Sequence, residues 1–263
     1  MNKAPMGKVK PPREIVLDDR AAEEQMRLRT RRSFLTGGVA AAAGISAYAW
    51  LKTRDQIGGV PWPQRLVLGG NEKLAHAYLS DARLLPTYSL ADVGKLRPNG
   101  PFGLEDDVDE DTWRLKVETG AGMLPLALTL DHVQALPKVE MITKFCCIEG
   151  WSVVTRWAGA RFADFTRKYF PPGQELPEFV FMATPNGGYY VGLDTKSALH
   201  PQTLLAYEMN GEPLEDEHGA PLRLVIPVKY GVKNIKRIGL IRYTDTRTTD
   251  YWYERGYDWF VGL

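Results

Sequence analysis

The chain has 263 residues, and its 33 Lys and Arg against 32 Asp and Glu leave a formal net charge of +1. This balance leaves no excess of positive charge that would indicate binding to nucleic acid. Two cysteines are too few for a disulfide scaffold. The sequence also lacks a CxxCH haem motif, an iron–sulfur cysteine cluster, a P-loop, a dinucleotide-binding glycine fingerprint and an HExxH motif.

The first 51 residues carry the marks of an export signal. Residues 1 to 29 are polar, charged and punctuated by proline, and we expect them to be disordered on the cytoplasmic side. Arg31 and Arg32 then precede Ser33-Phe34-Leu35 and an uncharged, Gly- and Ala-rich run that ends at Leu51. This order is typical of a signal read by the twin-arginine translocase, which exports folded proteins to the periplasm. A basic end on a surface helix is the simpler alternative.

The sequence leaves open whether this signal is cleaved. Ala47-Tyr48-Ala49 has the small-x-small form of a cleavage site. The uncharged run from Ser33 to Leu51 is only just long enough to cross a bilayer, which needs about 20 apolar residues, and Lys52 and Arg54 could mark the end of an anchor. A soluble periplasmic protein and one tethered to the inner membrane by its N-terminal segment therefore both remain open.

The rest of the chain divides into an irregular N-terminal arm, residues 52 to 110, and one domain, residues 111 to 263. The arm is rich in Gly, Pro and Asp, and we predict one helix in it, from Glu72 to Leu79. Short strands mixed with isolated helices, without regular β-α alternation, predict an α+β domain. The predicted strands are Trp113 to Glu118, Leu124 to Leu130, Glu140 to Phe145, Phe179 to Ala183, Tyr189 to Val191, Arg223 to Ile226 and Ile235 to Tyr243, and the predicted helices are Asp131 to Leu136 and Arg161 to Tyr169.

Both cysteines lie in the run Phe145-Cys146-Cys147-Ile148-Glu149-Gly150-Trp151-Ser152, where a strand is predicted to end. A thiolate is a soft, strongly donating metal ligand. Two adjacent cysteines are strained as a disulfide, and no CxxC pair or cysteine–histidine cluster indicates zinc. From the spacing alone, two small buried hydrophobic residues are the more frequent explanation.

Two segments near the C-terminal end, His218 to Arg223 and Pro227 to Lys236, combine basic residues with glycine. A buried phosphate must be met by arginine, lysine and backbone N–H groups, because an unpaired buried dianion is prohibitively costly. From the charge spacing alone, a solvated basic strand edge is the more frequent alternative. The groups that could meet a phosphate are the fork of Arg223, the close backbone approach at Gly231, and the point charges of Lys233 and Lys236.

In both regions the sequence resembles the sulfite-oxidase-fold molybdopterin enzymes, especially the periplasmic methionine sulfoxide reductases. In that group a Cys followed by an apolar residue, Glu, Gly or Ala, Trp and Ser ligates molybdenum. Cys147 is the match, because it carries Glu149 at the right spacing, and Cys146 stays a buried hydrophobic residue. The resemblance covers residues 99 to about 245. It implies a sulfite oxidase-type molybdopterin-binding domain of mixed sheets with short helices, and Mo-molybdopterin as the cofactor.

The same resemblance assigns the cofactor-binding residues. In that group Asn-Gly-Ala-Pro-x-Arg leads into Pro-x-Lys-Tyr-Gly-x-Lys-x-Ile-Lys, and several of these residues contact the molybdopterin. His218 stands where the group has the first Asn, which makes its protonation state a new variable. A turn residue after Pro98 is the alternative for Asn99. The implied cofactor-binding residues are Asn99, Thr184, His218, Arg223, Asn234, Ile235 and Lys236.

The implied reaction is oxygen-atom transfer, with Cys147 as the metal ligand and Glu149 as the acid–base or orienting group. Because a carboxylate beside the metal would repel sulfite, the resemblance favours reduction of a small, neutral sulfoxide- or N-oxide-like substrate in the periplasm. A sulfite-type oxidase or dehydrogenase stays open, because Arg156 and Arg161 lie close in sequence to Cys147.

The resemblance also implies an electron-transfer partner, a membrane b-type cytochrome, since the chain carries no haem motif of its own. Two alternatives come from other classes: a cofactor-free binding module of the same fold, and a membrane-tethered structural subunit. The joint presence of Cys147, Glu149, Arg223 and Lys236 argues against a degenerate site. Metal content separates both alternatives from the enzyme.

Overall fold

The computed structural model describes residues 18–80, 82–120 and 122–263. These residues belong to two compact units, one that ends at Arg54 and one that runs from Asp55 to Leu263. The expectation for residues 1 to 17 lies outside the described part of the chain.

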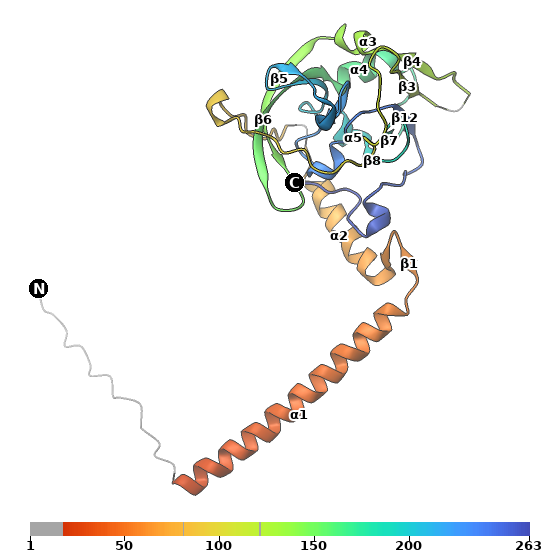
Figure 1. The fold of residues 1–263 in the computed structure, drawn as a ribbon. Coiled ribbons are helices and arrows are strands. Elements are labelled where there is room, and N and C mark those ends of the chain that lie inside the picture. The colour runs from red at the N-terminus through yellow and green to blue at the C-terminus, as the bar shows by residue number, and fades with distance from the viewer. Residues whose placement is uncertain (1–17, 81, 121) are drawn as a thin grey trace, which may run out of the picture. The chain divides into compact units, whose positions relative to one another are not determined.

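The first unit is the helix α1, Asp19–Lys52 (Figure 1). The carboxylate of Asp18 accepts a hydrogen bond from the backbone N–H of Arg20 at 3.1 Å and caps the helix. The disorder that we expected up to residue 29 is therefore wrong from Asp19 onward, where Ala, Glu, Gln, Met, Leu and Arg favour a helix. None of its side chains is buried. Among the described residues α1 is the one helix long and apolar enough to cross a membrane, a test that a signal sequence also passes.

The second unit begins with a hairpin and a long helix, which corrects the irregular arm that we expected. Strands β1 (Gln56–Ile57) and β2 (Val60–Pro61) pair across Gly58 and Gly59, which adopt the positive φ angles of a tight turn. Helix α2 then runs over Trp62–Tyr78, whereas the sequence predicted only its last part. The adjacent Gly69 and Gly70 weaken the helical signal there. A short 3-10 helix, η1 (Leu90–Asp92), follows.

One sheet of the domain is antiparallel and has the order β10-β9-β6-β5, with β11 also paired to β9. Strands β5 and β6 pair from Lys138↔Ala160 to Cys146↔Ser152, so the turn between them contains Cys147. The prediction of β5 is confirmed, whereas β6 and β9 were not predicted. The elements are β5 (Lys138–Cys146), β6 (Ser152–Arg161), β9 (Leu204–Met209), β10 (Glu212–Pro213), β11 (Arg223–Val225), and the 3-10 helices η2 (Asp216–His218) and η3 (Gly231–Lys233).

The other sheet has the order β4-β3-β12-β7-β8, in which β12 pairs with β3 in parallel. The strand predicted over Ile235 to Tyr243 exists only from Leu240, because Arg237 adopts the left-handed region at φ 48° and breaks the extended run. The elements are β3 (Leu115–Glu118), β4 (Leu126–Leu128), β7 (Phe179–Ala183), β8 (Tyr190–Asp194), β12 (Leu240–Thr244), α3 (Leu130–Gln134), α4 (Phe162–Tyr169), α5 (Thr195–Ala198) and η4 (Tyr253–Arg255).

The main hydrophobic core joins the two sheets. It includes Leu115, Val180 and Ile241 from the second sheet and Leu205 and Leu224 from the first. A smaller cluster around Trp157, Met141 and Leu204 involves the first sheet as well. Mixed sheets with short, isolated helices confirm the predicted α+β class.

Candidate cofactor and active site

A cavity of about 190 Å³ lies beside the turn that follows β5. The predicted site residues come together here, because all of them except Thr184 and Ile235 line the cavity. Residues far apart in the sequence close it, and they come from the loop before residue 103, the β5–β6 turn, η2, β11, η3 and the segment near η4. The lining includes Asn99, Gly100, Phe102, Phe145, Cys147, Glu149, Trp151, Tyr189, His218, Arg223, Gly231, Val232, Asn234, Lys236, Trp252 and Tyr257.

The β5–β6 turn presents Cys147 to the cavity. The backbone N–H of Cys147 donates to the carbonyl of Trp151 at 2.9 Å, and that of Gly150 donates to the carbonyl of Cys147 at 3.1 Å. Gly150 adopts φ 91°, which a side chain would disfavour. The thiol of Cys147 is buried and accepts a hydrogen bond from Asn99 Nδ2 at 3.5 Å. Cys146, still within β5, does not line the cavity.

Glu149 lies at the exposed edge of the cavity, and two side chains hold its carboxylate. Its Oε2 accepts hydrogen bonds from Trp151 Nε1 at 3.0 Å and from Asn99 Nδ2 at 3.3 Å. Asn99 therefore contacts both the thiol of Cys147 and the carboxylate of Glu149. A turn residue, which was the alternative, does not require these two contacts.

Arg223, on β11, carries a buried positive charge without a carboxylate partner among the described residues. Its Nη1 donates to the carbonyl of His218 at 2.8 Å and its Nη2 to that of Asn234 at 3.4 Å. Its Nε is buried with no hydrogen-bond partner in the part of the chain that the structure describes, and its guanidinium lies 4.7 Å from the ring of Trp157. Burial lowers the pKa of Arg223 to about 9. A buried cation with an unused donor is the arrangement that an anion would complete.

His218 and Lys236 line the same cavity as Arg223. Burial and the Arg223 charge lower the pKa of Lys236 to about 8, and its Nζ donates to the carbonyls of Asn99 and Gly100 at 3.3 and 3.2 Å. Burial and the same charge lower the pKa of His218, whose Nδ1 is buried without a hydrogen-bond partner among the described residues. Three basic groups thus converge on one cavity.

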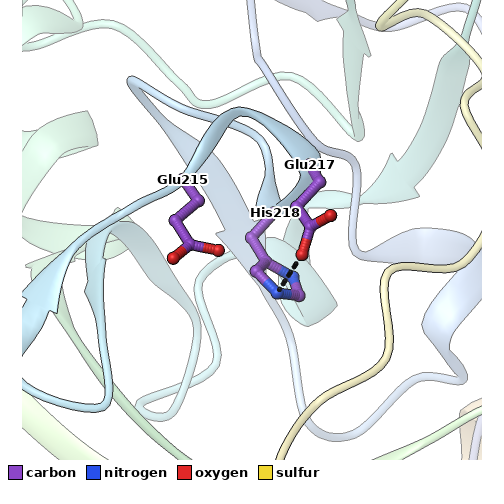
Figure 2. A group of neighbouring side chains, drawn as sticks. All are labelled: Glu215, Glu217 and His218. Carbon is purple, nitrogen blue, oxygen red and sulfur yellow. Dashed lines mark ion pairs between the residues drawn. The ribbon is translucent and has the colours of Figure 1, made fainter.

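Two carboxylates, those of Glu215 and Glu217, lie near the ring of His218 (Figure 2). Glu217 Oε1 lies 3.5 Å from His218 Nε2, and Glu215, Glu217 and His218 offer possible metal-ligand atoms within 4.8 Å of one another. Both glutamates are exposed, and Coulombic repulsion from Arg223 and Lys236 acts on His218. The two glutamates act on His218 against Arg223 and Lys236, which explains the cluster, and we assign no cation to it.

The remaining predicted residues differ in where their side chains lie. Asn234 lines the cavity and braces it, because its Oδ1 accepts a hydrogen bond from the N–H of Ile226 at 2.8 Å. Ile235 packs in the main core and Thr184 bonds locally to Asn186 and Tyr189, and neither lines the cavity. Lys233, which we expected to supply a point charge, instead pairs with buried Asp250 at 2.6 Å.

Sequence reasoning missed the aromatic wall of the cavity. It is formed by Phe102, Tyr189, Trp252 and Tyr257, together with Phe145 and Trp151 of the β5–β6 region. Phe102 contacts Trp252 edge to face at 5.9 Å between ring centroids. These residues come from separate segments, and no local motif marks them. The frequency of aromatic residues in 250 to 260 is the one signal that could have pointed to them.

Arg156 and Arg161, which kept sulfite oxidation open, do not line the cavity. Arg156 forms a bidentate pair with Glu140 across β5 and β6, and Arg161 precedes α4. Sequence proximity to Cys147 therefore does not bring either guanidinium to the site. Arg97, which was not predicted, lines the cavity and lies 5.7 Å from the ring of Trp151.

Comparison with known sequences gives one family match. Residues 102–252 match the oxidoreductase molybdopterin binding domain. This range includes every predicted site residue except Asn99.

Among curated relatives, a protein of Azospira oryzae named YedZ1, described as a protein-methionine-sulfoxide reductase subunit, is 34% identical over 183 residues, 68% of each chain. The protein-methionine-sulfoxide reductase catalytic subunit MsrP of Xanthomonas campestris is 35% identical over 155 residues, 54% of this chain and 48% of its own. The chain therefore spans about half the length of that second relative. Among solved structures, the sulfane dehydrogenase SoxCD of Paracoccus pantotrophus matches 54% of this chain and 41% of its own, at 17% identity and a TM-score of 0.49.

Proposed function

The chain belongs to the oxidoreductase molybdopterin binding domain family, and from that premise we propose that it is a molybdenum-cofactor enzyme that reduces a sulfoxide-like substrate. The observation that carries the proposal is the cavity that Cys147, Glu149 and Arg223 line together. Arg223 is buried there and has no carboxylate partner among the described residues. The names of the methionine sulfoxide reductase relatives support the same substrate class.

The donor set of the cavity fits the cofactor. A molybdopterin carries a phosphate, and Arg223 Nε and His218 Nδ1 are buried polar atoms that lack a partner in the described structure. Arg223, His218 and Lys236 would hold the phosphate and pterin end, with Asn234 bracing the loop around it. Cys147 would ligate molybdenum as a thiolate. A bound dianion would also raise the lowered pKa values of Lys236 and His218, since it favours their charged forms.

The bound cofactor would supply two-electron oxygen-atom chemistry, so that a sulfoxide, two protons and two electrons give a sulfide and water. Glu149 is the group that we assign to proton delivery. Both hydrogen bonds to its carboxylate are accepted by Oε2, so we expect Oε1 to carry the proton. Trp151 and Asn99 would orient that carboxylate. Asn99 would in addition bond to the sulfur of Cys147.

The aromatic wall supports a neutral sulfur substrate. Thioether groups make favourable contacts with aromatic rings, and Phe102 and Tyr257 combine ring surface with partial exposure at the cavity. Before it takes up that proton, Glu149 would add negative charge at the cavity edge, which disfavours an anion there. We therefore propose a small sulfoxide, or the sulfoxide of a methionine side chain, as the substrate, with N-oxides as the next class to test.

Steady-state reduction with an artificial electron donor tests this proposal. Wild-type protein should reduce methyl sulfoxides, whereas Glu149→Gln should retain its molybdenum and lose most of its activity, because the amide cannot deliver a proton. Glu140→Gln is the matched control, since that glutamate pairs with Arg156 away from the cavity. Sulfoxide turnover at wild-type rate in Glu149→Gln would remove Glu149 from the mechanism, and no turnover of any sulfoxide by the loaded wild type would remove the substrate class.

Sulfite oxidation is a second candidate, which the cavity position of Arg97 supports. A guanidinium there could attract an anionic substrate. Under this alternative, Arg97→Gln would raise the KM for sulfite in an assay with an electron acceptor, and leave sulfoxide reduction unchanged. Absence of sulfite-dependent turnover in wild-type protein would remove this candidate.

We also propose the cellular setting of the reaction. The paired Arg31 and Arg32 ahead of the apolar part of α1 support twin-arginine export to the periplasm, with α1 either cleaved or retained as an anchor. Electrons would come from a membrane b-type cytochrome. The word subunit in the names of both relatives supports a partner protein.

A further inference from the structure

Three polar side chains on one face of helix α2 contact the domain. Arg65 donates from Nη1 to the carbonyl of Tyr257 at 2.7 Å and from Nη2 to that of Tyr253 at 3.1 Å. Glu72 pairs with Arg247 at 2.8 Å. His76 lies 3.8 Å from a carboxylate oxygen of Asp194 and its ring centroid lies 5.4 Å from that of Phe260. Arg65, Glu72 and His76 thus hold α2 against the segment from residue 247 to the C-terminal end and against Asp194. Figure 1 shows α2 next to that segment.

The opposite face of α2 is apolar and points outward. Leu66, Val67 and Leu74 are 67%, 67% and 73% exposed. At about 100° per residue, these three side chains and Gly70 and Ala77 fall within roughly a third of the helix circumference, and no charged residue interrupts that arc. A surface helix of a soluble protein shows the reverse pattern. The arrangement therefore calls for an apolar environment outside the domain.

Few residues connect the end of α1 to the start of α2. The N–H of Trp62, the first residue of α2, donates to the carbonyl of Asp55 at 3.0 Å because the β1–β2 hairpin folds the linker back on itself. Only Thr53 and Arg54 separate Asp55 from Lys52, the last residue of α1. At no more than about 3.6 Å per residue, this tether is about 11 Å long at most. If α1 crosses a bilayer, α2 must begin near the bilayer surface.

We propose that the outward face of α2, formed by Leu66, Val67 and Leu74, lies in the headgroup region of the membrane that α1 enters. Amphipathic helices bind this region with their apolar face buried by about 5–10 Å. The inference rests on the proposed membrane placement of α1 and is independent of the proposed reaction. The lipid surface is the occupant because the tether brings it within reach of α2 whatever partner protein is present.

This contact would also orient the active site. Tyr257, whose carbonyl bonds to Arg65 of α2, lines the cavity, and so does Trp252 of the same segment. An α2 that lies flat on the bilayer would therefore fix the direction of the cavity relative to the membrane, which would favour repeated encounters with an electron donor in that membrane.

Spin-label accessibility on the full chain tests the proposal. The variants Leu66→Cys and Leu74→Cys, in a Cys146→Ser background with the cofactor loaded, are labelled with a nitroxide and reconstituted into vesicles of phosphatidylethanolamine and phosphatidylglycerol. Gln64→Cys, which is exposed on the same helix outside the apolar arc, is the matched control. Accessibility to oxygen, which concentrates in lipid, is compared with accessibility to a water-soluble nickel chelate.

We expect the ratio of oxygen to nickel accessibility to be several-fold higher at positions 66 and 74 than at position 64. Equal ratios at the three positions, with free access to nickel, would overturn the proposal. Labels at 66 and 74 that are shielded from both reagents would also overturn it, because the face would then be covered by protein, either a second copy or a partner. Neither outcome depends on catalytic activity, so the test stands apart from the proposed reaction.

Discussion

At Arg223 a full positive charge is held inside the protein by two backbone carbonyls and the face of an indole. Desolvation of a buried charge costs several kcal/mol when no opposite charge repays it, and it lowers the pKa of Arg223 to about 9. A purely structural role would be served better by an apolar residue of similar volume. An anion bound in the cavity would offset the desolvation free energy of the buried Arg223 charge.

Arg223→Met should therefore separate cofactor binding from folding. A charge-assisted hydrogen bond is worth roughly 1.5–3 kcal/mol, and 1.4 kcal/mol is about tenfold in affinity. We expect the molybdenum content after purification and dialysis to fall at least about tenfold, with the cofactor-free chain still folded by circular dichroism. Arg156→Met, which removes an arginine paired with Glu140 outside the cavity, should keep its molybdenum. Equal molybdenum content in the two variants would contradict the anion site at Arg223.

His218 should make the stability of the cofactor-free chain depend on pH. Burial, then Arg223 and Lys236, lower its pKa, and these outweigh Glu217 and Glu215, which raise it. Below the ordinary value of 6.5 the unfolded chain binds the proton more readily than the folded chain, so the stability contribution is lost as pH falls through this range.

The test is thermal unfolding at pH values from 8 to 5. Wild type should lose more melting temperature on acidification than His218→Asn, since the amide does not titrate. Parallel curves for the two proteins would show that His218 is not held neutral by its surroundings.

Among the elements, the β5–β6 turn and η3 depend on each other through one close contact. A Cβ on Gly231 would lie 2.7 Å from the ring of Phe145, which stacks on Trp151 at 5.9 Å between centroids. Trp151 in turn holds the carboxylate of Glu149. The glycine at the start of η3 thus allows the turn that carries Cys147 to approach it.

Gly231→Ala should therefore displace the Phe145 ring and disturb Glu149. Overpacking of this kind costs about 1–3 kcal/mol, and we expect a lower free energy of unfolding in urea together with a lower kcat. Gly69→Ala is the control: nothing lies within 4 Å of the added Cβ, and alanine favours a helix by about 0.5–1 kcal/mol. An unchanged kcat in a folded Gly231→Ala protein would contradict the coupling of η3 to the turn.

The local elements and motifs were predictable to different degrees. The alternation of β3, β5 and β7 and the spacing of Cys147 and Glu149 are properties of short segments, so the sequence predicted them. Strand β6 was missed because it is buried along much of its length and lacks a polar alternation. The aromatic wall and the separation of Arg156 from the cavity depend on which segments meet in three dimensions, which one sequence does not encode locally.

On the scale of the whole molecule, the described chain separates into a helix with no buried side chain and a domain that carries the complete candidate site. The proposed export route, which accepts folded proteins, suits this separation of helix and domain. The domain could fold and bind its cofactor before transport. The paired Arg31 and Arg32 lie inside the exposed helix α1, where a translocase can reach them.

Replacing both arginines by lysine tests this route. Arg31→Lys with Arg32→Lys keeps the charge and removes the guanidinium groups, and we expect the cofactor-loaded protein to accumulate in the cytoplasmic fraction. Arg27→Lys with Arg29→Lys, in the same helix, should leave export unchanged. Normal periplasmic delivery of the first variant would exclude the twin-arginine route without affecting the assignment of the cavity.

The most direct test of the central claim is X-ray absorption at the molybdenum edge, on wild-type protein and Cys147→Ser purified after native maturation. We predict molybdenum in stoichiometric amount in the wild type, with sulfur ligation that decreases by one sulfur in Cys147→Ser, because serine replaces the thiolate by oxygen. The absence of molybdenum from properly exported wild-type protein would contradict the enzyme assignment. Unchanged sulfur ligation in the variant would contradict Cys147 as the ligand.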